Sequence, residues 1–139
     1  LAMLDASGEA VFSAVLRTNQ LRARISSNAT YCDNWTEPEP ATEHGTFHLI
    51  DSGVCWVRSE ALAAPLRLAA GDLVVFPQGT AHLLSATPDG RGEPEARFTS
   101  MLCGEFEFAT GKRNAIVDAL PDWFVVRGAE GGRSSRRKK

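Results

Sequence analysis

The sequence has no run of about 20 consecutive apolar residues, the length that a membrane-spanning helix needs. Its N-terminus also lacks the basic region followed by an apolar one that marks a signal peptide. We therefore expect a cytoplasmic protein with no membrane anchor. The 139 residues, of which 43% are hydrophobic, are enough for one compact domain with its own core and too few for two.

Cysteine is scarce as well, since the chain contains only Cys32, Cys55 and Cys103. Their number is odd and no two of them form a CxxC pair, which argues against both a disulfide framework and a zinc ribbon. The sequence therefore predicts three reduced thiols.

Acidic side chains outnumber basic ones in most of the chain. Residues 127–139 carry six basic side chains and one acidic one, which leaves nine basic and sixteen acidic side chains in residues 1–126. An acidic body is repelled by the phosphate backbone that dominates nucleic-acid affinity, so we expect no direct DNA binding by the folded part. We predict a single domain over residues 1–126 and a disordered basic tail or linker over residues 127–139.

Hydrophobic residues alternate with polar ones along much of the chain, which is the period of β-strands. The expected strands are short and are separated by turn residues, for example Ser52-Gly53 between the strands of a hairpin. Such spacing is typical of a β-sandwich or β-barrel. The expected strands cover residues 21–25, 29–35, 46–51, 54–58, 65–69, 72–76, 81–86 and 97–108.

Other segments depart from this pattern. Residues 8–19 and 112–120 have apolar residues at helical spacing, which predicts a short helix near each end of the domain. Residues 36–45 hold two prolines and three glutamates, so we expect an exposed loop there rather than a strand in the middle of a sheet. Residues 87–96 and 128–139 lack large apolar side chains, which predicts that both are mobile.

One segment carries a family motif. Residues 71–82 read G-DLVVF-P-Q-G-TA-H. Gly71 opens a turn into a strand, Pro77 and Gly79 turn the chain out of it, and His82 then projects from the next strand. The segment resembles the second motif of the cupin superfamily. This resemblance implies an all-β fold, a cupin-type β-barrel of the jelly-roll or double-stranded β-helix type, in which the histidine points into the barrel.

The first cupin motif is matched poorly. Thr46 stands where cupins usually have a glutamate, and Ala86 stands where the second motif has an asparagine. The site of three histidines and one glutamate found in many cupin oxygenases therefore does not carry over.

A narrower resemblance covers nearly the whole chain. Residues 46–58, 68–82, 101–108 and 115–123 are similar, in this order, to the cupin domain at the N-terminus of one group of AraC/XylS-type transcription regulators. In that family the domain binds a small effector or mediates dimer contacts, and a separate helix-turn-helix domain reads DNA. The resemblance implies a non-enzymatic effector-binding domain that forms a homodimer, with the DNA-binding domain absent from this chain.

Two other functions stay open. The first is a small free-standing, metal-dependent cupin enzyme of the oxygenase or isomerase type, with His48 and His82 as metal ligands. The second is a barrel that has lost its ligand and only dimerises. The apolar pair Ile116 and Leu120, on one face of the second expected helix, predicts where a dimer would form.

The histidines are the candidate metal ligands. His44 and His48 fall on one face of an expected strand because strand side chains alternate, and the cupin resemblance implies that His82 lies nearby. Two or three imidazoles suit a divalent transition metal such as Zn²⁺, Fe²⁺ or Ni²⁺. Glu43 is the acidic residue beside them in the sequence. The alternative is that His48 is a hydrogen-bonded core residue and His44 belongs to the loop.

The long strand expected at 97–108 adds candidate ligand contacts. Met101 and Cys103 share one face of it, and a Cys103 thiolate could complete a set of two histidines and one cysteine, although a buried structural cysteine is commoner. Trp56 alternates with Cys55, so one of the two lines the cavity. The expected ligand-binding residues are His48, His82, Trp56, Met101 and Cys103.

The sequence offers no further catalytic pattern. No Ser-His-Asp order, phosphate-binding glycine loop or pair of carboxylates on one face can be assembled from it. Asp72 follows a turn glycine and is interpreted as a turn residue.

Overall fold

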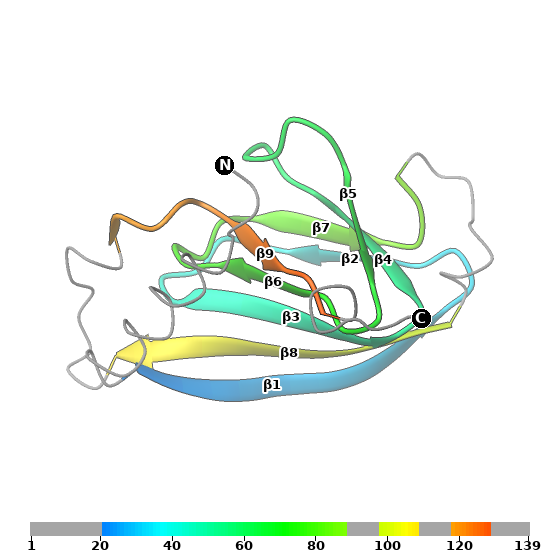
Figure 1. Cartoon of the computed structure of the whole chain (residues 1–139), viewed down its shortest axis with the longest axis horizontal. Coiled ribbons are helices and arrows are strands. Elements are labelled where there is room, and N and C mark those ends of the chain that lie inside the picture. Colours follow the sequence, from blue (N-terminus) through cyan, green and yellow to red (C-terminus); the bar gives the residue numbers. More distant parts are fainter. Residues whose placement is uncertain (1–20, 89–97, 109–117, 129–139) are drawn as a thin grey trace.

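Two antiparallel β-sheets face each other and form the fold (Figure 1). The computed structural model describes residues 21–88, 98–108 and 118–128. The strands in these residues are β1 (Leu21–Cys32), β2 (Thr36–Glu39), β3 (Gly45–Ser52), β4 (Val54–Arg58), β5 (Leu66–Ala69), β6 (Leu73–Phe76), β7 (His82–Ser85), β8 (Phe98–Phe108) and β9 (Phe124–Val126).

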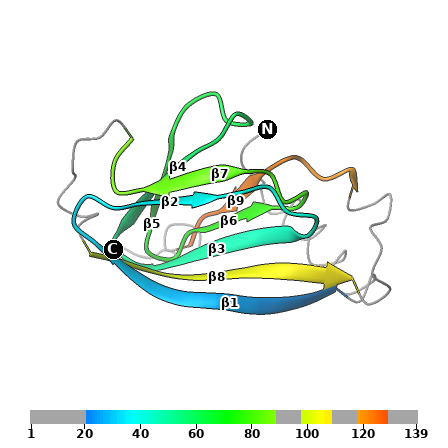
Figure 2. The ribbon, with the colours of Figure 1, turned by 180° about the vertical axis from the view of Figure 1, so that it is seen from behind.

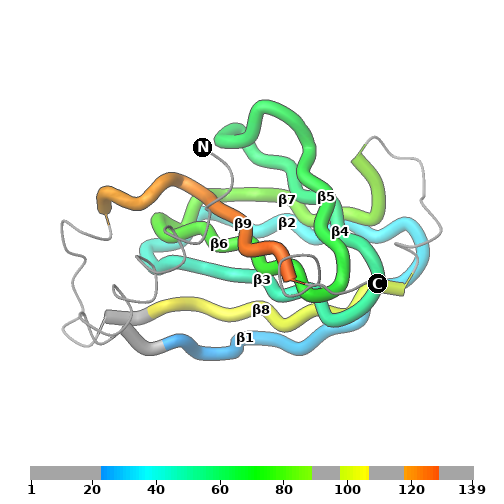
Figure 3. Tube along the Cα trace, in the orientation of Figure 1, coloured from blue at the N-terminus to red at the C-terminus, as the bar shows by residue number. Residues whose placement is uncertain are grey.

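Strands that are far apart in the sequence lie side by side in both sheets. One sheet has the order β1-β8-β3-β6-β9 and the other has the order β2-β7-β4-β5. Figure 2 shows the two layers from behind, and Figure 3 traces β1 and β8 as a long outer pair along one side. This arrangement confirms the predicted all-β, cupin-type fold.

Several expectations lie outside the described residues. The helix expected at 8–19 is not among them, and of the one expected at 112–120 only 118–120 are described, as a helical residue at Asp118 followed by a turn and a bend. Most of the two segments expected to be mobile is also outside. No helix in the described part of the chain is long and apolar enough to cross a membrane.

The beginning of the sheet differs from the sequence prediction. Residues 21–32, which span the first expected strand (21–25) and the start of the second (29–35), form one continuous strand, β1, which pairs with β8 along its length. The expected strand residues 33–35 lie after its end. A register shift between Ile25 and Ser27 marks a β-bulge. A bulge interrupts the alternation of side chains without ending the strand, which is why the sequence pattern looks like two elements.

The prediction of a loop throughout residues 36–45 was also wrong. Thr36–Glu39 form β2, which pairs with β7. Pro38 is tolerated because β2 is the edge strand of its sheet, where a missing N–H need not break a second ladder. The strand places Glu37 and Glu39 on one half-buried face, so two carboxylates do share a face.

The loop that leads to β7 requires a glycine at position 79. Gly79 has a φ of 71°, in the left-handed region that other residues rarely adopt. A Cβ at this position would also collide with the backbone oxygens of Thr42 and His44. The Gly79 N–H donates to the Phe76 carbonyl (3.0 Å) and closes the turn between β6 and β7.

The main core fills the space between the two sheets. Val74 of β6 belongs to it, whereas the adjacent Val75 belongs to a second cluster with Phe106 and Phe124, so the second cluster lies on the outer face of the five-stranded sheet. The largest fully buried side chains of the main core are Phe76, Ile50, Leu68, Leu84 and Met101.

Candidate functional site

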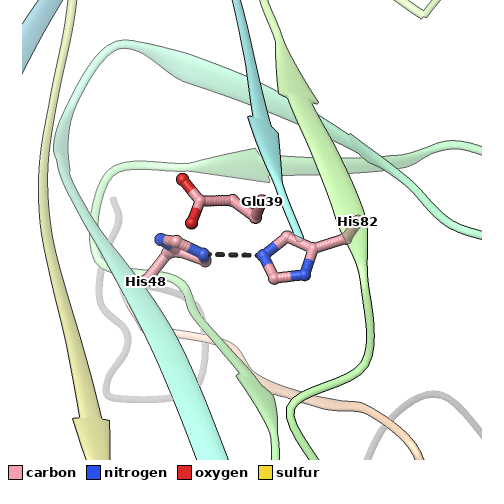
Figure 4. Close-up of side chains that lie close together, drawn as sticks. All are labelled: Glu39, His48 and His82. Atoms are coloured by element: carbon pink, nitrogen blue, oxygen red, sulfur yellow. Dashed lines mark hydrogen bonds between the residues drawn. The ribbon is translucent and has the colours of Figure 1, made fainter. Parts of the chain in front are cut away.

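His48 and His82 come from different sheets and meet in the interior. His48 belongs to β3 and His82 is the first residue of β7. Both are buried, with 2% and 7% of their surface exposed. Their Nε2 atoms lie 2.8 Å apart and their rings meet edge to face (Figure 4). The structure thus brings together the two histidines that the sequence places in one site.

Two contacts fix the ring of His82. Its face stacks on Phe76, with ring centroids 3.8 Å apart and an interplanar angle of 8°. Its Nδ1–H donates to the Thr80 carbonyl at 2.8 Å. A hydrogen bond of this kind orients many metal-binding imidazoles, because it fixes the lone pair of the other nitrogen. Here that other nitrogen is Nε2, which points at His48.

Cys103 is the second neighbour of His48. β8 pairs with β3 so that Cys103 is directly opposite His48. The Cys103 Sγ atom lies 2.9 Å from His48 Nδ1. Both ring nitrogens of His48 are therefore in hydrogen-bond contact, one with a thiol and one with an imidazole.

Glu39 joins the two histidines from the edge strand. The register of β2 and β7 sets Glu39 opposite His82. One ligand atom each of Glu39, His48 and His82 lies within 4.8 Å of the others, and Figure 4 shows the carboxylate beside His48. Glu39 was not among the site residues predicted from the sequence, because its segment was expected to be a loop. The alternation of Glu37 and Glu39 with other residues was the available signal.

The two imidazoles are neutral at physiological pH. Burial, and to a smaller extent the charge of His82, lowers the pKa of His48 to about 3. Burial also lowers the pKa of His82, against the opposing effect of its hydrogen bond to Thr80. For Glu39, burial and then the charge of Glu37 raise the pKa above its ordinary value. Neutral imidazoles are the form that binds metals.

The neighbouring thiols stay protonated. Burial raises the pKa of Cys103 to about 11, and it raises the pKa of Cys55 to about 12. An ion pair between a Cys103 thiolate and a protonated His48 is disfavoured, because burial favours the protonated thiol and the neutral imidazole. The contact between them is therefore a neutral hydrogen bond and does not activate a nucleophile.

His44 lies away from this cluster. It precedes β3, its side chain is 48% exposed, and its Nε2 faces Glu105 Oε1 at 3.4 Å. Glu43 is exposed next to it. His44 precedes the strand and is held at Glu105, so the structure does not bring it together with His48 and His82.

The other predicted ligand contacts occupy different environments. Met101 is fully buried in the main core, opposite Ile50 in the strand register. Cys55 is fully buried, and the charge of Cys103 contributes to its raised pKa, so both thiols face the interior. Trp56 is half-buried and packs against the core from its side of β4.

A pocket opens beside the histidines. Its volume is about 1020 Å³, and Glu39 and His82 are part of its wall. The wall is formed by the end of β2, the end of β4 and the loop before β7. The lining residues are Pro38, Glu39, Pro40, Arg58, Ser59, Glu60, Thr80, Ala81, His82 and Leu83.

The donor set fits a divalent transition metal. Two neutral imidazoles converge through Nε2, one of them is oriented by a backbone carbonyl, and a carboxylate lies beside them. Nitrogen donors with a carboxylate suit Zn²⁺, Fe²⁺ or Ni²⁺.

Two facing sheets with two histidines buried between them define a β-barrel of the cupin type. The chain belongs to the cupin family, because the profile of the family described as Cupin matches residues 10–137.

The chain is also similar to proteins of known structure. YhaK from Escherichia coli is 9% identical, with a TM-score of 0.50 over 76% of this chain and 43% of that one. ToxT from Vibrio cholerae is 7% identical, with a TM-score of 0.43 over 63% of this chain and 30% of that one. The chain thus spans less than half the length of either protein. No curated protein sequence matches it significantly.

Proposed function

We propose that this cupin domain is the effector-binding domain of an AraC-type transcription regulator, as its sequence resemblance implies. The observation that carries the proposal is the pocket of about 1020 Å³ beside His82 and Glu39. This volume is at the upper end of the range for small-molecule sites. Leu83 and Pro38 offer apolar contacts in the same wall, whereas Arg58 offers a charge.

In this proposal a divalent metal is held by Glu39, His48 and His82. When bound, the metal supplies a Lewis acid that polarises an oxygen atom of the effector. Phe76 and the Thr80 carbonyl keep the His82 ring in place for this role. Burial keeps both imidazoles neutral and thus free to bind.

The proposal extends to the domain bounds, the oligomeric state and the partners of the chain. We propose one domain over residues 1–126, a linker from residue 127, a homodimer and no direct DNA binding by the domain itself. All three cysteines are free, which supports a reducing compartment such as the cytoplasm.

A thermal-shift screen with small polar organic molecules, with and without Zn²⁺, tests the proposal. A compound at about 100 times its Kd should stabilise the chain by about 2.7 kcal/mol. Ala81→Trp fills the pocket from an exposed lining position, and Ala70→Trp places the same bulk in the turn after β5. Loss of the shift in the first variant only supports the pocket. Equal shifts in both variants would refute it.

The second candidate function is a metal-dependent enzyme. The observation that favours it is the same cluster of Glu39, His48 and His82, because a metal there is next to the pocket. Conversion of a stabilising compound by the metal-loaded chain would support the enzyme. Unchanged compound after prolonged incubation would support the effector-binding domain.

A further inference from the structure

The donor and acceptor of each hydrogen bond around the histidines follow from the contact between His82 and the Thr80 carbonyl. A carbonyl oxygen only accepts, so His82 Nδ1 carries a hydrogen and donates it to Thr80. The ring is neutral, and its Nε2 is therefore a bare acceptor. Since His82 Nε2 cannot donate, the hydrogen between the two rings belongs to His48 Nε2.

The same reasoning reaches Cys103. With its hydrogen on Nε2, neutral His48 has a bare Nδ1 that can only accept. The atom 2.9 Å from it is Cys103 Sγ, so the thiol donates its hydrogen. The two histidines are thus opposite tautomers, Nε2–H at His48 and Nδ1–H at His82, in a chain that runs from the thiol to the Thr80 carbonyl.

A metal ion at His48 Nε2 would have to replace the hydrogen that now lies between the two rings. A neutral His48 then carries its hydrogen on Nδ1, and Cys103 must accept where it had donated. A thiol is suited to this exchange because it is both a weak donor and a weak acceptor. An alanine side chain can do neither, whereas a serine hydroxyl can do both.

The fold holds Cys103 in place for this role. The β-bulge in β1 sets Ser27 directly opposite Cys103, and the Ser27 side chain is a hydrogen-bond partner of the thiol. Ser26 Oγ donates to the Cys103 carbonyl at 3.1 Å. The thiol is therefore held from β1 on one side and meets His48 of β3 on the other.

We propose that Cys103 is a positioning residue that donates its thiol hydrogen to the bare Nδ1 of His48 in the metal-free protein and becomes the acceptor of an Nδ1–H when a divalent metal binds His48 Nε2. The first half of this proposal, the donor role of Cys103, concerns the metal-free protein. The second half, its acceptor role, rests on the proposed function. The two halves are measured separately, so a failure to bind metal does not affect the test of the first half.

Histidine tautomers in the full chain can be read by nitrogen-15 NMR, since protonated and bare ring nitrogens differ strongly in chemical shift. In the metal-free wild type we expect Nε2–H at His48 and Nδ1–H at His82. Cys103→Ser should keep this pattern and the hydrogen bond to His48 Nδ1. Cys103→Ala should keep both tautomers, which Thr80 fixes through His82, but should shift the Nδ1 signal of His48, because this nitrogen loses its donor. Cys55→Ala, which removes the other buried interior thiol, should leave both rings unchanged. Backbone amide spectra establish that each variant is folded.

Zinc titration tests the second half. Changes to residues that orient a metal ligand typically weaken metal binding 10–100-fold, so we expect a loss of this size for Cys103→Ala and only a few-fold change for Cys103→Ser. An Nδ1–H tautomer of His48 in the metal-free wild type, or an unchanged His48 signal in Cys103→Ala, would overturn the proposal. Equal zinc affinity of Cys103→Ala and the wild type would overturn its second half alone.

Discussion

The two ends of β6 differ in the polar groups beside them, which are charged at one end and neutral at the other. At its start, the carboxylate of Asp72 accepts hydrogen bonds from the Ala69 N–H, from Arg127 Nη1 (both 2.8 Å) and from the Gly128 N–H (3.1 Å). At its far end, Phe76 stacks on His82, which shares a single hydrogen with His48.

The difference separates structural from binding groups. The charge of Asp72 is matched by that of Arg127, and both its oxygens are engaged, so nothing is left to bind a ligand. In the described residues no ion pair is formed by Glu39, and in the proposed function a metal ion takes the place of the hydrogen between His48 and His82. A short strand thus connects a charge-paired network around Asp72 with a neutral, hydrogen-bonded pair of imidazoles that lies beside the Glu39 carboxylate.

The largest expected effect is a loss of stability at the start of β6. Asp72→Ala removes the acceptor of two backbone N–H groups and the charge partner of Arg127, which keeps only its hydrogen bond to the Arg67 carbonyl. This change should lower the free energy of unfolding by about 3 kcal/mol. Urea unfolding measures the change, with Asp51→Ala at an exposed position as the control. The zinc affinity of the folded protein should be unchanged. A loss below about 1 kcal/mol would contradict the structural role of Asp72.

The next largest effect is a dependence of stability on pH at the other end. His48 has a lowered pKa of about 3 in the folded state, so the unfolded chain takes up a proton first as the pH falls below about 6.5. Stability should therefore decrease with falling pH until about pH 3, and the cost at pH 5 should be about 2 kcal/mol for His48 alone. His82 acts in the same direction.

His48→Gln isolates this contribution because glutamine does not titrate. Urea unfolding of both proteins at pH 7 and pH 5 should show a smaller loss in the variant. The raised pKa of Glu39 acts in the opposite direction and is common to both proteins. An identical loss in both would mean that His48 is not held neutral.

A smaller effect should come from the ring that supports His82. Phe76→Leu keeps an apolar side chain of similar size in the core and should cost only about 1 kcal/mol of stability. Because it removes the stacking that orients His82, zinc affinity should fall about tenfold. Phe124→Leu is the matched control, since this equally buried ring belongs to the outer cluster. Equal zinc affinity in both variants would argue against a role for the stacking.

The smallest effect is expected at His44. Its contact with Glu105 is partly exposed, and such pairs contribute little, so His44→Ala should change stability by less than about 1 kcal/mol. Zinc affinity should stay at the wild-type value. A marked loss of zinc affinity would show that His44 contributes to the site.

The spacing of residues 71–82 was sufficient to predict the strand β6 and its flanking turns, because glycine and proline fix turns locally. The inward direction of His82 was implied by the cupin resemblance. Neither Glu39 as a site residue nor the bulge before Ser27 was predicted from the sequence. An edge strand with Pro38 has a weak local signal, and the register of β2 against β7 depends on contacts between residues far apart in the chain. Cys103 was named as a candidate, but its position opposite His48 also depends on register.

Equilibrium dialysis of the full chain against Zn²⁺ tests the central claim most directly, with His82→Ala and His44→Ala measured in parallel. The account predicts one zinc ion per chain in the wild type and in His44→Ala, and a loss of affinity of about 100-fold or more in His82→Ala, which removes a direct ligand. Equal zinc binding by the wild type and His82→Ala, or no binding by either, would contradict it.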